Sequence, residues 1–239
     1  MFILSLIKFG VINLTNIAII PARGGSKRIP LKNIKDFLGE PIIQRVLKEI
    51  HSSDIFDQII VSTDDEVIRQ VVENMKFVDI HNRPSSLSDD FTGTQAVIQS
   101  VCNELNLGDQ DNICCIYPTA ALIKAETLHE SLLNFTNSDA DFLFSAKRFE
   151  HPVQRGFCIN DKSKLTFVEE THISKRTQDL TEMYFDAGYF YWGSGIAWKE
   201  ARSIISPANE VHIYGALESY DIDERADWAI VEKLARILG

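Results

Sequence analysis

The feature that most constrains the fold is an alternation of short apolar segments with amphipathic segments over the first 145 residues. The apolar segments read as buried strands and lie at residues 17–20, 58–62, 77–80, 113–117 and 142–145. The amphipathic segments carry apolar residues at helical spacing and lie at residues 41–52, 64–75, 94–105 and 125–135. Strands that alternate with helices form βαβ units, so the pattern predicts an α/β protein with a doubly wound, mainly parallel sheet.

The domain organisation follows from where this alternation stops. After about Lys147 the chain becomes polar, and we expect residues 148–185 to be a small β-containing insertion in a single domain that spans residues 16–239. Residues 1–15 are apolar, but Lys8 lies inside the apolar run and no small-residue cleavage site follows. We therefore expect an N-terminal extension or a misplaced start rather than a signal peptide.

Composition excludes several classes of protein. A net charge of −10 argues against a nucleic-acid binder, which usually has a basic face. No apolar run approaches the roughly 20 residues that span a bilayer. The four cysteines form no CxxC pair, which predicts reduced, buried thiols in a cytoplasmic protein rather than a disulfide framework or a zinc site. They are Cys102, Cys114, Cys115 and Cys158.

The first candidate site is the loop that follows the strand at residues 17–20. Gly24 and Gly25 let backbone N–H groups turn towards phosphate oxygens. Five cations lie in the same 13 residues, in a chain that is acidic as a whole, and they are Arg23, Lys27, Arg28, Lys32 and Lys35. The loop is neither GxxxxGK[ST] nor GxGxxG, yet it predicts a polyphosphate site. The alternative is a glycine-rich turn with solvated cations.

A pair of carboxylates precedes the last expected helix, at residues 224–238. Asp221 and Asp223 are two residues apart, so in an extended segment they face the same side and can share a hard cation such as Mg²⁺. The alternative is that Asp223 serves as the helix cap.

Other polar residues follow expected strands. Because ligands of open α/β sheets bind beyond the carboxyl ends of the strands, these residues are further candidates. Arg83 begins a polar loop that leads to Thr94, and Thr119 belongs to the segment Tyr117–Ala120. Thr94, like Asp64 or Asp65, is equally well explained as a helix cap.

A last cluster lies in and after the insertion. Arg155 and Arg176 are suited to clamp a carboxylate, and nearby aromatic side chains could flank a sugar. The alternative is solvated arginines beside a strand that packs its aromatic residues. The cluster comprises His151, Gln154, Arg155, Arg176, Gln178, Asp186 and the aromatic residues at 189–192.

With these motifs in view, the chain resembles the CMP-sialic acid synthetase family, and within it the pseudaminate branch, from about Asn16 to its C-terminus. The motifs are IIPARGGSKRIPLKN (19–33), IVSTDD (60–65), RPSSLSDDFTGT (83–94), YPTA (117–120), KRTQDL (175–180), DAGYFYWG (186–193) and DIDE (221–224). The resemblance implies a Rossmann-like nucleotidyltransferase fold, Mg²⁺-dependent use of CTP, and a homodimer built partly by the inserted segment.

The resemblance also implies roles for single residues. Nucleotide and phosphate contacts fall on Arg23, Gly24, Gly25, Ser26, Lys27, Lys32, Asn33, Arg83 and Thr119. Sugar contacts fall on Thr94, Gln154, Arg155, Arg176 and Tyr191. The metal falls on Asp221 and Asp223, and catalysis on Lys27, Lys32 and Asp223. One departure is Tyr117, which stands where sialate synthetases carry Gln, so the contact of that Gln does not carry over.

The reaction that the sequence predicts is attack of the anomeric hydroxyl of a nine-carbon 2-keto acid sugar on the α-phosphorus of CTP. Pyrophosphate leaves and a CMP-sugar forms, with pseudaminic acid as the expected acceptor. Alternatives are the same reaction on N-acetylneuraminic acid, legionaminic acid or Kdo. More remote alternatives are a sugar 1-phosphate acceptor and a nucleotide-binding protein without activity.

Overall fold

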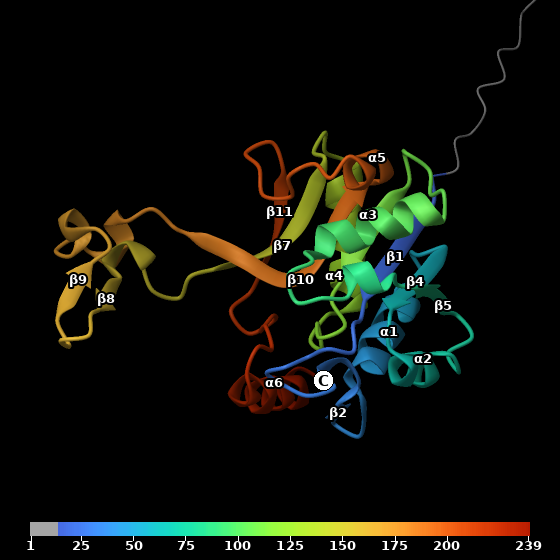
Figure 1. Ribbon diagram of the computed structural model, residues 1–239. Coiled ribbons are helices and arrows are strands. Elements are labelled where there is room, and N and C mark those ends of the chain that lie inside the picture. Colours follow the sequence, from blue (N-terminus) through green and yellow to red (C-terminus); the bar gives the residue numbers. More distant parts are fainter. Residues whose placement is uncertain (1–13) are drawn as a thin grey trace, which may run out of the picture.

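A mainly parallel sheet forms the centre of the computed structural model, which describes residues 14–239 (Figure 1). Its strand order is β11-β7-β10-β6-β1-β4-β5, and only β10 runs antiparallel to its neighbours. The strands are β1 Asn16–Pro21, β4 Gln58–Thr63, β5 Asp79–Asn82, β6 Asn112–Ile116, β7 Phe142–Arg148, β10 Tyr184–Ser194 and β11 Glu210–Tyr214. The expected fold class, an α/β protein with a doubly wound sheet, is confirmed.

Helices cover both faces of this sheet because its strands are apolar on both sides. Along β1, Ala18 and Ile20 pack into one core cluster with α1, while Ile17 and Ile19 pack into another with α3. The first cluster also receives α2, α4 and α6, and the second receives α5. The helices are α1 Ile42–Ser52, α2 Glu66–Val72, α3 Thr94–Glu104, α4 Ala125–Thr136, α5 Gly195–Lys199 and α6 Arg225–Leu238.

Two buried tryptophans anchor the end of β10 and the helix after it. The Trp192 ring stacks on Phe56 at 5.3 Å between centroids, and its Nε1 donates to Ser131 Oγ at 2.9 Å. The Trp198 Nε1 donates to the carbonyl oxygen of Ile113 at 3.2 Å. Each indole N–H therefore has a partner, as burial of this side chain requires.

Some sequence predictions differ from the structure at the ends of elements. The helix expected at residues 64–75 is shorter, and Asp65 caps it, since its Oδ1 accepts from the backbone N–H groups of Val67 and Ile68. The strand expected at residues 188–192 is 11 residues long. The prediction of buried thiols holds for three cysteines and is wrong for Cys158, which is exposed because its short strand has no covering layer.

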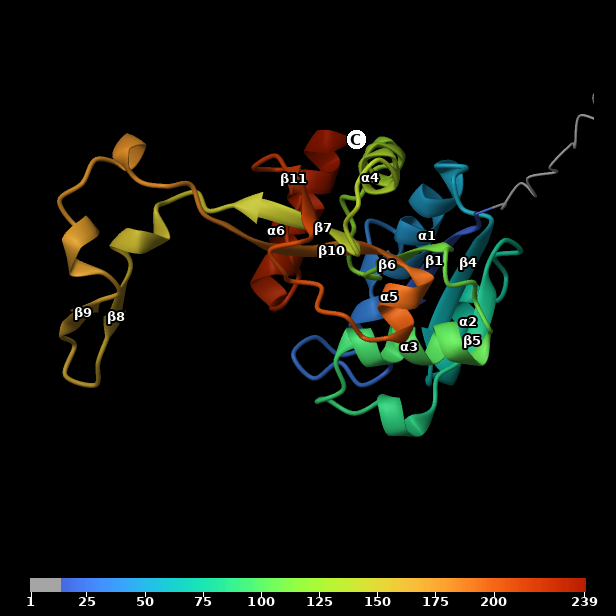
Figure 2. The same cartoon turned by 90° about the horizontal axis from the view of Figure 1, so that it is seen from above.

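Residues 149–183 form an arm that projects from the sheet between β7 and β10 (Figures 1 and 2). It carries an antiparallel hairpin of β8 Phe157–Ile159 and β9 Leu165–Phe167, and every residue of both strands is exposed. A second small hairpin pairs β2 Asp36–Phe37 with β3 Glu40–Pro41.

The expected N-terminal extension over residues 1–15 lies almost wholly outside the described residues. Within residues 14–239, none of the helices combines the length and the hydropathy needed to cross a bilayer.

Stability should depend on the glycine that begins α5. A Cβ at Gly195 would overlap the carbonyl oxygen of Gly108, which belongs to the backbone and has little freedom to move. We expect Gly195→Ala to lower the free energy of unfolding in urea by about 1–3 kcal/mol, the scale of overpacking. Gly93→Ala is the control, because a Cβ there meets open space at a φ of −68°. Equal stability of the two variants would show that close packing against Gly108 does not require glycine at position 195.

Candidate active site

A pocket of about 210 Å³ opens where β1, β5 and β6 end. Parallel strands bring residues that follow them to one edge of the sheet, so distant segments converge there. The pocket combines seven of the residues expected from the sequence with five others. Its lining consists of Pro21, Arg23, Ser26, Lys32, Asn33, Arg83, Thr92, Thr94, Val97, Tyr117, Pro118 and Thr119.

The glycine-rich loop is held in place by the start of α2. The Gly24 N–H donates to Asp64 Oδ1 at 3.2 Å, and a Cβ on Gly24 would overlap the Asp65 side chain. Asn33 is buried and its Nδ2 donates to the carbonyl oxygen of Arg23 at 2.9 Å. The shape of the loop therefore depends on Asp64, Asp65 and Asn33, and Gly24 is needed for close packing.

Lys32 links this loop to the paired carboxylates. Its Nζ donates to the carbonyl oxygen of Ile222 at 2.7 Å. Burial lowers the pKa of Lys32, while the charges of Asp221 and Asp223 oppose that change. The two candidate sites, far apart in the sequence, are thus neighbours in space.

Asp221 and Asp223 flank Ile222, which is fully buried and holds this segment to the core. Burial and the neighbouring Asp223 charge raise the pKa of Asp221, and Lys32 opposes the rise. Arg28 donates to Asp223 Oδ1 at 2.6 Å.

Helix capping does not explain Asp223. The cap of α6 is Glu224, which forms a capping box with Asp227. The Asp223 backbone N–H donates to Asp227 Oδ2 at 2.9 Å, so the Asp223 carboxylate is left for other partners. The explanation of this residue as a helix cap is therefore wrong.

Arg83 is a buried cation on the pocket wall. Its Nη2 donates to the carbonyl oxygen of Ser62 at 2.8 Å. Burial lowers the pKa of Arg83, and the charge of Asp64 opposes this. Behind it, Ser62 Oγ lies 3.1 Å from His81 Nδ1, and His81 Nε2 lies 3.0 Å from Glu104 Oε2. Sequence reasoning missed His81, whose only signal is a polar residue in a strand.

Asp90 pairs with the loop cations and was also missed. Arg23 Nη1 donates to Asp90 Oδ1 at 2.7 Å, and Lys27 forms an ion pair with the other oxygen of the same carboxylate. These hydrogen bonds lower the pKa of Asp90. The sequence feature that could have indicated Asp90 is the Asp-Asp doublet at residues 89–90, in a polar loop that lies beside the glycine-rich segment in the structure.

Thr94 and Tyr117 face each other in the pocket, with 2.9 Å between their hydroxyl oxygens. Thr94 is the first residue of α3 and follows the N-cap residue Gly93, so the explanation of Thr94 as the helix cap is wrong. Burial raises the pKa of Tyr117 to about 12. Tyr191 is not part of the lining; it lies behind Tyr117, with ring centroids 5.5 Å apart.

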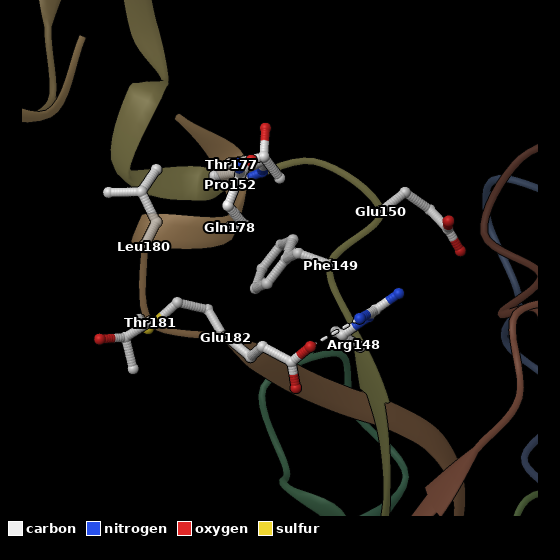
Figure 3. A pocket seen from close by; sticks show the side chains of 10 residues that line it. Arg148, Phe149, Glu150, Pro152, Thr177, Gln178, Leu180, Thr181 and Glu182 are labelled. Atoms are coloured by element: carbon white, nitrogen blue, oxygen red, sulfur yellow. Dashed lines mark hydrogen bonds and ion pairs between the residues drawn. The ribbon is translucent and has the colours of Figure 1, made fainter. Parts of the chain in front are cut away.

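The remaining candidates for sugar binding lie on the arm and do not line this pocket. Gln154 donates to the carbonyl oxygen of Thr181 at 2.7 Å, Arg155 to Thr177 Oγ1 at 2.6 Å, and Arg176 pairs with Asp179. The arm has a cavity of its own, about 470 Å³, around Phe149 (Figure 3). Its lining includes Gln178 and the Arg148–Glu182 ion pair.

Fold and site together define the class of protein. A basic glycine-rich loop after the first strand, next to paired carboxylates, at the carboxyl edge of a parallel sheet is the arrangement of a nucleotide-handling α/β protein. The family described as Cytidylyltransferase matches residues 17–202. The chain belongs to the cytidylyltransferase family, and the resemblance noted in the sequence is confirmed.

Individual relatives support the same family, and a solved structure supports the fold. The chain is 39% identical to pseudaminic acid cytidylyltransferase of Campylobacter jejuni subsp. jejuni serotype O:2, over 93% of this chain and 97% of the relative. It is 29% identical to N-acylneuraminate cytidylyltransferase B of Danio rerio, over 90% of this chain and 50% of the relative. Among solved structures, CMP:2-keto-3-deoxy-manno-octonic acid synthetase complexed with CTP is similar at TM-score 0.67 and 15% identity, over 93% and 99% of the two chains. This last likeness shows the fold.

Asp90 should weaken nucleotide binding, because it occupies the cations that a triphosphate would contact. We expect Asp90→Asn to lower the Kd for CTP by about two- to fivefold, the scale of an exposed ion pair. The measurement is isothermal titration calorimetry at fixed ionic strength. Asp139→Asn makes the same change of charge after α4, outside the pocket, and should leave the Kd unchanged. A Kd that rises in Asp90→Asn would show that Asp90 supports the site instead.

Proposed function

We propose that this protein transfers CMP from CTP to pseudaminic acid, a nine-carbon 2-keto acid sugar, and releases pyrophosphate. The observation that carries the proposal is 39% identity to a pseudaminic acid cytidylyltransferase over nearly the whole of both chains. The pocket supports it, since basic residues from the first loop converge with Arg83 and the paired carboxylates at one edge of the sheet.

In the proposed reaction, the anomeric hydroxyl oxygen forms a bond to the α-phosphorus of CTP, and the bond from that phosphorus to the bridging oxygen breaks. The electron pair of that bond leaves with pyrophosphate, and the proton of the attacking hydroxyl is released to water. Such a transfer needs positioned reactants and stabilised charge more than covalent help from the protein. Lys27 and Lys32 would stabilise phosphate charge, and Arg23, Ser26 and Asn33 would position the triphosphate.

A magnesium ion fits the paired carboxylates. The raised pKa of Asp221 reflects its burial and then the like charge of Asp223, and a divalent cation would stabilise both carboxylates in their charged form. Among the residues that the structure describes, no group of three or more His, Cys, Asp or Glu side chains could hold a metal. Asp221 and Asp223 would hold the ion, which would supply positive charge against the charge that develops on the phosphates.

A homodimer would complete the site. Arg155 and Arg176, the cations expected to hold the sugar carboxylate, lie on an arm that projects from the body of the chain (Figures 1 and 2). The hairpin on this arm exposes large apolar side chains, including Phe157 at 52% and Phe167 at 40%. Exposed apolar patches of this kind are typical of protein interfaces. We propose that a second copy covers the hairpin and receives the arm at its own pocket.

The proposed location is the cytoplasm. Cys102, Cys114 and Cys115 are buried free thiols, and burial raises the pKa of each, so they stay protonated. Free cysteines are typical of a reducing compartment.

Asp223 should be essential for turnover. We expect Asp223→Asn to reduce pyrophosphate release by about 10²-fold, the scale of losing one strong electrostatic contribution to the transition state. The assay supplies CTP, Mg²⁺ and, separately, pseudaminic, legionaminic, N-acetylneuraminic and Kdo acids. Asp139→Asn serves again as the control. Release with another acid alone would overturn the proposed substrate, and near-normal turnover of Asp223→Asn would remove Asp223 from the mechanism.

Two inactive variants should restore activity when mixed. Arg176→Ala lacks the arm cation and Asp223→Asn lacks the metal ligand, so a mixed dimer has one site with both residues intact. We expect the mixture, after joint unfolding and refolding or slow subunit exchange, to recover about a quarter of wild-type activity, since half of the dimers are mixed and each has one intact site of two. Activity no greater than that of either variant would show that each arm serves its own chain.

A further inference from the structure

The segment that leads into the paired carboxylates is held by side chains instead of by strand pairing. Residues 219–222 lie outside the helices and strands, and their backbone makes no hydrogen bond to other backbone groups in the part of the chain that the structure describes. Lys147 Nζ donates to the Ser219 carbonyl oxygen at 3.0 Å. Lys32 Nζ donates to the Ile222 carbonyl oxygen at 2.7 Å. The segment is therefore fixed at both ends by cations from other elements.

Tyr189 supplies two further contacts between these ends, and both go to Tyr220. Its hydroxyl oxygen accepts from the Tyr220 N–H at 3.1 Å, and the hydroxyl donates to the Tyr220 carbonyl oxygen at 3.3 Å. That carbonyl belongs to the peptide group that joins Tyr220 to Asp221. Burial raises the pKa of Tyr189, so the hydroxyl keeps the proton that it donates. One phenol group thus holds both backbone polar groups of the residue before the carboxylate.

An irregularity in β10 brings Tyr189 to this segment. The register of β10 against β7 shifts there, and Gly188 has a φ of +67°. The N–H groups of Tyr189 and Phe190 both donate to the buried Ser145 Oγ, at 3.1 and 3.2 Å, which gives them an acceptor where the pairing is interrupted. A Cβ on Gly188 would lie 3.7 Å from the Asp221 carboxylate. The irregular part of β10 therefore lies beside this carboxylate and holds the backbone that carries it.

A second buried tyrosine shows what is particular to Tyr189. Tyr214 lies against it, with ring centroids 5.4 Å apart, and is buried as well. The Tyr214 hydroxyl has no hydrogen-bond partner in the described part of the chain. The two side chains are therefore alike in burial and differ in what their hydroxyl groups hold.

We propose that Tyr189 and Lys147 are positioning residues for the divalent cation site of the paired carboxylates. By holding the backbone that leads into Asp221, they fix where its carboxylate lies relative to that of Asp223. Loss of a residue that orients a metal ligand typically weakens metal binding by about 10- to 100-fold. The inference rests on the proposed function, in which this cation accompanies the nucleotide.

Amide hydrogen exchange tests whether the hydroxyl holds the segment. The measurement follows a peptide that covers residues 219–222, without nucleotide or metal. Tyr189→Phe removes the acceptor of the Tyr220 N–H, so we expect faster exchange in this peptide than in the wild type.

Calorimetry tests whether the held segment serves the cation. The quantity is the Kd for CTP in EDTA divided by the Kd for CTP in saturating Mg²⁺, with no acceptor sugar present. By linkage, this ratio reports how much more tightly the ion binds to the protein–CTP complex than to free CTP. We expect the ratio to fall about tenfold in Tyr189→Phe, the scale for a residue that orients a metal ligand, with the Kd in EDTA unchanged.

A matched control and a second variant accompany it. Tyr214→Phe removes the neighbouring hydroxyl and should leave both the exchange and the ratio as in the wild type. Lys147→Met removes the donor to the Ser219 carbonyl oxygen and should also lower the ratio. Its loss of positive charge would by itself favour a nearby cation, so a lower ratio in this variant does not arise from charge. Thermal unfolding of all three variants checks that each is folded.

The outcomes separate this inference from the proposed function. An unchanged ratio in either variant, with or without faster exchange, would overturn the assignment of the residue that it replaces. A lower ratio without faster exchange in Tyr189→Phe would also overturn it, because the effect would not pass through the backbone. If the wild type releases no pyrophosphate with any acid, the proposed function fails. Exchange and calorimetry would still test the inference in that case, since neither needs an acceptor.

Discussion

The parallel pairing of β1 with β4 on one side and β6 on the other is the constraint on which the rest of the structure depends. It directs the carboxyl ends of these three strands, and of β5, which pairs parallel with β4, to the same edge of the sheet. The glycine-rich loop, the Arg83 loop and the segment Tyr117–Ala120 consequently meet there, although nearly 100 residues separate them in the chain. Helices on both faces bury the apolar side chains of these strands and hold the edge in place.

Much of this fold could be predicted because each buried strand is a short apolar run and each helix carries apolar residues on one face. The direction of β10 could not be predicted, since the periodicity of a strand does not show which strands it pairs with or in which direction. Its direction depends on the connection: the chain leaves β7 through the arm and returns from the same end, so β10 enters the sheet antiparallel. Helix ends were displaced because Asp65 and Glu224 cap helices that Asp64 and Asp223 could have capped equally well.

The candidate site likewise contains residues that the sequence could predict and residues that it could not. Arg23, Lys32, Arg83 and Thr119 could be predicted to converge because each follows a strand of the parallel sheet. Asp90 could not, because it reaches the first loop from an irregular segment that follows no periodic pattern. The hydrogen bond from Tyr191 to Asp186 could not be predicted either, because it needs a break in strand register that no sequence pattern indicates. The arm residues fall outside the pocket because the connection that carries them projects away from the sheet.

The ion pairs of the basic loop have a consequence for how a substrate enters. Arg23 and Lys27 share the single carboxylate of Asp90, and Arg28 pairs with Asp223, so three cations of the loop already have carboxylate partners before a ligand binds. A phosphate group that bound Arg28 would displace Asp223 from it and leave Lys32 as the nearby cation for that carboxylate. If the nucleotide enters with the divalent cation proposed above, phosphate would replace Asp223 at the arginine and the cation would replace the arginine at Asp223. Under that proposal the site would favour the metal–nucleotide complex over the free nucleotide, because the complex brings a new partner for both members of the Arg28–Asp223 ion pair.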